Sequence, residues 1–156
     1  MVFVLVGIAS FFGVIAGYLL AIISPEELEP GKRYLQFFQN LLLLTLLIMF
    51  LAFSKVYFLL TVAASLFLLG ALWLVTEMKK EQDLHKVLFV MTPLLIFFSR
   101  GTLLWVTAAL IFLYGMPTAS LFVGSRKRLS KTRQFGAVME QYGIFLLLVL
   151  ILAILA

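Results

Sequence analysis

Polar side chains of three kinds stand near one end of the apolar segments of this sequence, where they could bind a solute by hydrogen bonds. The set consists of four amides, one imidazole and one carboxylate: Gln36, Gln39, Asn40, Gln141, His85 and Glu140. The first three amides are spaced three and four positions apart, which places them on one face of a helix. Because ionisable groups inside membrane segments are functional candidates, Glu140, the only acid in such a segment, marks the set as a candidate cavity. The alternative is that these side chains bond to one another or to lipid headgroups.

Several reactions lack the residues that they need. The chain has no Cys, which excludes a disulfide framework and a Cys nucleophile. His85 is the sole histidine and has no second ligand at zinc spacing, so we expect no metal and no cofactor. The sequence also shows no phosphate loop, no catalytic Ser–Lys or Ser–His–Asp arrangement and no paired intramembrane carboxylates. We therefore expect no enzyme; the least favoured alternative is a lipid-modifying enzyme that uses Glu140 and His85 as acid and base.

A basic run follows the fifth apolar segment. Its cations are Arg126, Lys127, Arg128, Lys131 and Arg133. Such a run binds anionic lipid headgroups or an acidic partner, and it also orients a membrane protein. No aromatic residue lies between the cations, so nucleic acid is not an expected partner.

Two single cations, Lys55 and Arg100, each follow a serine between apolar segments. A cation at a tight turn holds that turn in the headgroup layer, because its side chain reaches the lipid phosphates. The alternative is that the two cations flank an outer vestibule that attracts an anion.

Small residues recur at every fourth position of the first apolar segment: Ala9, Gly13, Gly17 and Ala21. Such a stripe lets another helix approach closely, which favours association in lipid. We predict a packing face that meets a neighbouring segment, a second copy of the chain or a different membrane subunit.

The elements that hold these residues must lie in lipid. Of the 156 residues, 64% are apolar and 12% are charged, and the mean hydropathy is +1.17. A soluble domain carries about 25% charged residues, because water must wet its surface. The composition therefore predicts an all-α polytopic membrane protein.

We predict six transmembrane helices, arranged as three hairpins in a single domain over residues 1–156. The crossings lie at residues 2–23, 34–53, 56–76, 87–99, 102–123 and 137–156. The fourth is short for a bilayer and contains Pro93, and Leu84 and His85 can lengthen it. Ten of the twelve Lys and Arg residues fall in the three long loops. The positive-inside rule then places these loops in the cytoplasm and both termini outside the cell membrane.

An internal repeat links the third and fifth crossings. Residues 53–71 and 98–116, at an offset of 45, share eight identities in nineteen positions. Because both crossings start at the outer face, the predicted repeat is parallel, with its axis along the membrane normal.

These features predict a small transporter or channel-like protomer for a neutral solute, an anionic solute or a lipid. Ion coupling is not expected, because no carboxylate lies at the membrane midplane. The alternative is a non-catalytic scaffold or accessory subunit, which would dock a larger complex through its packing stripe and its basic face.

Overall fold

The computed structural model describes residues 2–53, 81–99, 101–126 and 129–155, which contain five α-helices and no strand. The helices are α1 (Val2–Ile23), α2 (Leu28–Phe53), α4 (Glu81–Phe98), α5 (Thr102–Gly124) and α6 (Lys131–Leu155). The predicted crossing at 56–76, the cation Lys55 and one half of the proposed repeat lie outside the described residues.

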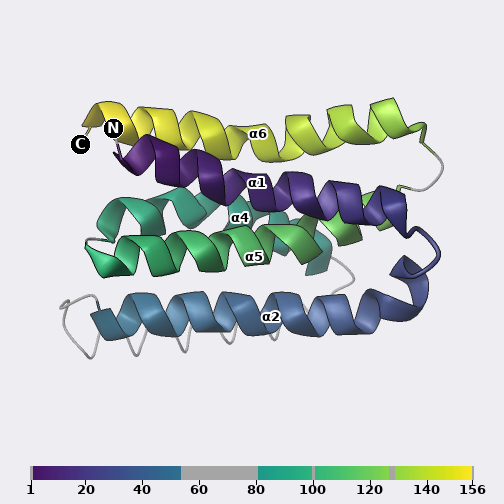
Figure 1. Cartoon of the computed structure of the whole chain (residues 1–156), viewed down its shortest axis with the longest axis horizontal. Helices are drawn as coiled ribbons and strands as arrows, with labels where there is room; N and C mark the ends of the chain where they lie inside the picture. Colours follow the sequence, from purple (N-terminus) through teal and green to yellow (C-terminus); the bar gives the residue numbers. More distant parts are fainter. Residues whose placement is uncertain (1, 54–80, 100, 127–128, 156) are drawn as a thin grey trace.

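Among the described helices, α1, α5, α4 and α6 close into a four-helix ring in which each helix packs mainly on two neighbours within the ring. Helix α2 packs on α5 from outside this ring (Figure 1). Helix α5 is therefore shared by the ring and α2, and it is buried along much of its length.

Successive described connections alternate between the two ends of the bundle (Figure 1). The α1–α2 connection, the α5–α6 connection and the start of α4 lie at one end, which we call the loop end. The start of α1, the end of α6 and the α4–α5 turn lie at the opposite end. The basic and polar loops thus gather at one end of an apolar bundle.

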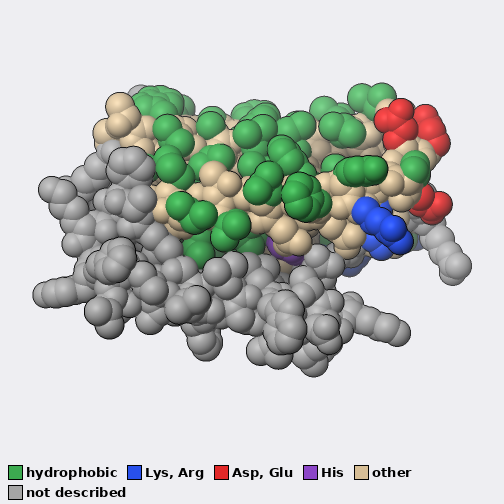
Figure 2. Space-filling view, turned by 90° about the horizontal axis from the view of Figure 1, so that it is seen from below, with side chains coloured by type: hydrophobic (Ala, Val, Ile, Leu, Met, Phe, Trp, Pro, Cys, Tyr) green, Lys and Arg blue, Asp and Glu red, His purple; other side chains and the backbone are tan. Residues whose placement is uncertain are grey.

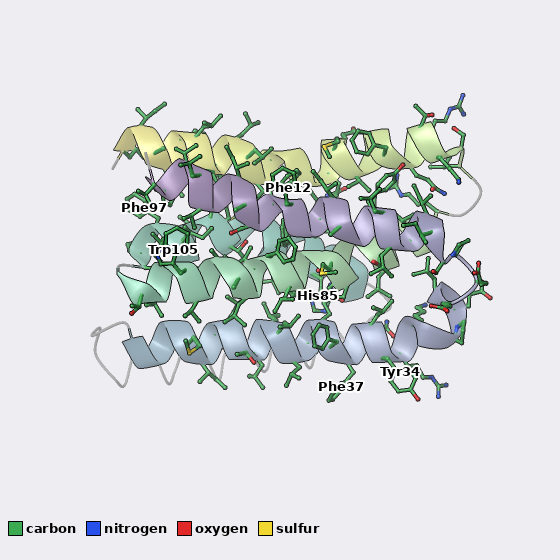
Figure 3. The ribbon with its side chains drawn as sticks, viewed as in Figure 1. Phe12, Tyr34, Phe37, His85, Phe97 and Trp105 are labelled. Atoms are coloured by element: carbon green, nitrogen blue, oxygen red, sulfur yellow. The ribbon has the colours of Figure 1, made fainter. Side chains whose placement is uncertain are left out.

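Three of the described helices, α1, α5 and α6, are long and apolar enough to cross a membrane, and α4 contributes a shorter apolar stretch, His85–Phe98. Large apolar side chains also cover the outer surface, among them Leu5, Phe12, Trp105, Leu147 and Ile154 (Figures 2 and 3). Such a surface indicates a membrane location. The described helices do not by themselves support six crossings or the internal repeat, which stay predictions.

Helix α4 begins six residues before the predicted crossing at 87–99, because the helix continues through the polar residues that precede Val87. Its 18 residues span about 27 Å at 1.5 Å per residue. Pro93 lies inside it and cannot donate to the Phe89 carbonyl. The neighbouring Thr92 hydroxyl donates to that oxygen instead, at 2.6 Å, which keeps the buried carbonyl paired.

The predicted turn at residues 99–101 joins α4 to α5 in an antiparallel hairpin. Gly101 adopts a φ of 59°, a left-handed conformation that glycine accepts without steric cost. The Ser99 hydroxyl donates to the Leu95 carbonyl at 2.6 Å and lies 3.1 Å from the Thr107 hydroxyl, so it ties both helices to the turn. Arg100 lies outside the described residues.

The stripe of small residues on α1 faces α5. A Cβ added at Gly13 or Gly17 would overlap the backbone of α5 at Phe112 or Met116. The Ser120 hydroxyl donates to the Gly17 carbonyl at 2.8 Å across the same contact. Of the predicted set, Gly13, Gly17 and Ala21 are buried, whereas Ala9 is exposed. The stripe therefore packs on a neighbouring helix of the same chain.

Candidate solute site

A chain of buried hydrogen bonds links α2 to α5 in the half of the bundle nearer the loop end. The Gln39 side-chain amide donates to the Thr118 hydroxyl at 2.9 Å. That hydroxyl donates in turn to the Tyr114 carbonyl, one turn earlier on α5, at 2.7 Å. Gln39 and Thr118 are both about 3% exposed, so the amide is held within the protein and away from solvent.

Helix α4 joins this chain through His85. Its Nδ1 lies 2.8 Å from the Tyr114 hydroxyl, which also lies 3.4 Å from the His85 carbonyl oxygen. Either the hydroxyl donates to Nδ1, or Nδ1–H donates to the hydroxyl while the hydroxyl donates to the carbonyl. In the first arrangement His85 Nε2 carries the proton, and in the second it offers a lone pair. The position of one Tyr114 proton thus decides whether Nε2 donates or accepts.

We call Gln39, Thr118, Tyr114 and His85 the polar network. Helix α6 reaches it through Tyr142, whose hydroxyl lies 3.5 Å from the Thr118 carbonyl oxygen. Four helices, α2, α4, α5 and α6, therefore meet at this network. Thr118 lies six residues before the end of α5, about 9 Å from the loop end along the helix axis.

Aromatic side chains lie next to the network on the side of α5 that faces the four-helix ring. The Phe89 ring stacks on Phe145 at a centroid distance of 5.1 Å and meets Tyr142 edge-on at 5.6 Å. It also lies 6.1 Å from the Tyr114 ring. All four side chains are fully buried. A polar group enclosed by such rings has no water to bond to, so each of its hydrogen bonds must come from the protein or from a ligand.

Two buried polar atoms near the network have no hydrogen-bond partner in the described part of the chain, His85 Nε2 and Asn40 Oδ1. His85 is only 1% exposed, and Asn40 is adjacent to Gln39 on α2. Leaving a buried donor or acceptor unpaired costs about 1–3 kcal/mol. Most buried polar groups in folded proteins are paired, which makes these two atoms candidates for contact with a bound molecule.

The structure brings together only part of the predicted polar set. Gln39 and His85 join the network, while Gln36, Asn40 and Gln141 are half-buried. Glu140 is exposed and lies outside the network, which corrects the expectation of an acid inside the cavity. Helix α6 buries Val138 and Tyr142, and a residue two positions from each points to the opposite side of the helix. The position of Glu140 along the membrane segment did not reveal to which side of the helix its side chain points.

Tyr114, Thr118 and Tyr142 were missed by the sequence analysis. Tyr114 and Thr118 stand four positions apart on one helix face, a signal that was available in the sequence. They lie in long apolar segments, where isolated hydroxyl groups do not stand out.

The basic residues gather at the loop end, next to acidic residues (Figure 2). The Arg126 guanidinium and the Lys86 ammonium lie 4.5 Å and 5.0 Å from the centre of the Phe122 ring, within the range of a cation–π contact. Lys131 and Arg133 are exposed at the start of α6. Lys127 and Arg128 lie outside the described residues.

Among the described residues, no group of three His, Cys, Asp or Glu side chains is placed to hold a metal ion. Comparison of the chain with protein-family models, with curated proteins and with solved structures gives no match.

Proposed function

We propose that this protein binds a small, neutral polar solute at the polar network and lets it cross the membrane without ion coupling, as a transporter or channel-like protomer. The observation that carries the proposal is the unpartnered Nε2 of the buried His85. In Figure 3 the His85 side chain appears between the ribbons of α5 and α2, on the side of α5 to which Gln39 is also bonded. A solute with both donor and acceptor groups would complete the hydrogen bonding of this atom.

The chemistry of the network favours a neutral solute over an ion. Its side chains are an amide, two hydroxyls and an imidazole, and the one carboxylate of the predicted polar set, Glu140, is exposed on α6. Sodium coupling, and proton coupling through an acid, require a carboxylate that faces the pathway, and the network contains none. Hydrogen-bonding groups in an apolar cage select a solute by its donors and acceptors.

We further propose that the chain crosses the membrane six times, with the loop end in the cytoplasm and both termini outside. The shared position of the α1–α2 and α5–α6 connections at one end supports this orientation, together with the basic residues found there (Figures 1 and 2). The chain has no native Cys, so single cysteines report the topology directly. Thr102→Cys should react with an impermeant maleimide on intact cells, and Ser125→Cys should react only with a permeant one. Labelling of position 125 from outside would refute the orientation.

Osmotic reswelling of proteoliposomes tests the transport proposal. Purified protein is reconstituted and exposed to a sudden gradient of urea or glycerol, and light scattering follows the volume. We expect faster reswelling than in protein-free liposomes for at least one of these solutes. His85→Phe should reduce the excess rate about tenfold, the effect of losing a hydrogen bond worth about 1.4 kcal/mol. Phenylalanine retains the ring volume, and the Tyr114 hydroxyl can still donate to the carbonyl of residue 85.

Thr45→Ala is the matched control. The Thr45 hydroxyl bonds to the Leu41 carbonyl of its own helix at 2.8 Å and takes no part in the network, so reswelling should be unchanged. If wild-type liposomes reswell no faster than empty ones for both solutes, the network is structural. The non-catalytic membrane subunit then becomes the better assignment.

A further inference from the structure

Two adjoining cavities open at the loop end, apart from the polar network. The larger has a volume of about 350 Å³ and the smaller about 130 Å³. Leu28 and Gly124 line both, so the two cavities adjoin where the start of α2 meets the end of α5.

Each cavity combines an apolar wall with a cation. In the larger one, Ile22 and Val123 face Lys131 and Gln134. In the smaller one, Leu121 faces Lys32, with Glu29 in the same wall. The larger cavity, which has a cation and no acid in its lining, matches a molecule with an apolar part next to an anionic part.

The polar rim of the larger cavity is held in place before any ligand binds. The Tyr18 hydroxyl donates to the Lys131 carbonyl at 3.0 Å. The Gln134 side-chain amide donates to the Arg126 carbonyl at 3.1 Å, across the α5–α6 connection. Both bonds tie the start of α6 to the rest of the loop end, which lowers the entropy cost of binding there.

We propose that these cavities form a specific site for one anionic phospholipid. Its phosphate would lie at Lys131 in the larger cavity, whose lining includes no acid, and the first part of an acyl chain would lie against Ile22 and Leu28. A lipid is favoured over a soluble anion because the inner wall is apolar and the cavities open at the end of a bundle whose outer surface is apolar. The lipid site is separate from the solute site, and each can fail without the other.

Native mass spectrometry with defined lipids tests the site. Wild-type protein in mild detergent is mixed with dioleoyl phosphatidylglycerol or with dioleoyl phosphatidylcholine. We expect retention of one phosphatidylglycerol with about tenfold preference, the discrimination expected from one charge-assisted contact. Lys131→Gln should remove most of this preference.

A second variant blocks the site without changing its charge. A Cβ at Gly124 would lie 3.6 Å from Leu28 Cδ1, an ordinary contact, so the backbone tolerates a larger residue. The rest of the side chain in Gly124→Leu would then fill the cavities, and lipid retention should be lost while the thermal unfolding temperature is kept. Arg133→Gln is the control, because Arg133 is exposed at the same end and does not line either cavity.

Four results would overturn the proposal. Arg133→Gln could lower retention as much as Lys131→Gln, which would indicate diffuse attraction by the basic end. Phosphatidylcholine could be retained to the same extent as phosphatidylglycerol, or Gly124→Leu could leave the retention of phosphatidylglycerol intact. Displacement of phosphatidylglycerol by an equal concentration of glycerol 3-phosphate would instead identify a soluble phosphate compound as the occupant. The His85→Phe variant should retain phosphatidylglycerol as the wild type does, because His85 lines neither cavity.

Discussion

Single residues decide how closely the helices of this bundle approach one another. Gly13 and Gly17 have no space for a side chain because the backbone of α5 occupies it. The spacing of small residues was visible in the sequence, and it predicted a packing face. The sequence could not show that Ala9 is exposed, because a small residue is tolerated at buried and at exposed positions alike.

Gly13→Ala should destabilise the protein strongly, although the substitution adds only one methyl group. The added methyl group would overlap the Phe112 carbonyl and force α1 away from α5, at a cost of about 1–3 kcal/mol. Thermal unfolding in detergent measures the loss. Gly136→Ala is the control, since a Cβ there meets nothing within 4 Å, and it should stabilise α6 by up to about 1 kcal/mol. Equal stability of Gly13→Ala and wild type would refute the close contact.

The bounds of the elements followed from hydropathy where a helix lies wholly in apolar sequence. Helix α1 covers the predicted residues 2–23, and α5 ends one residue past the predicted 102–123. Helix α6 begins six residues before the predicted 137–156. Hydropathy reports only the part of a helix that suits lipid, and a helix continues into polar sequence while its backbone bonds can be made.

Thr92 and Pro93 should be energetically coupled within α4. Thr92→Val removes the hydroxyl that bonds to the Phe89 carbonyl and should cost about 1–2 kcal/mol, because that carbonyl has no bond from Pro93. In a Pro93→Ala background the residue 93 N–H can donate to the same oxygen, so the cost of Thr92→Val should shrink. A double-mutant cycle by chemical unfolding measures this coupling. Additive effects of the two substitutions would contradict it.

At the scale of the whole molecule, the sequence predicted the membrane location better than it predicted which helices pack together. Apolar residues face both the core and the lipid, so Phe11 is buried and the adjacent Phe12 is exposed (Figure 3). Periodicity therefore carries little information about which helices pair. The ring of α1, α5, α4 and α6, and the meeting of His85 on α4 with Tyr114 on α5, depend on contacts between residues far apart in the sequence.

The central proposal is that His85 Nε2 offers a buried hydrogen-bonding position to a neutral solute. His85 is the only histidine, so protein labelled with ¹⁵N-histidine gives one imidazole spin system. In solute-free protein, Nδ1 should show its bond to the Tyr114 hydroxyl, and Tyr114→Phe should change that signal. Titration with urea or glycerol should shift the Nε2 resonance in a saturable manner. A solute-free Nε2 that is already hydrogen-bonded, or an Nε2 resonance that neither solute moves, would contradict the account.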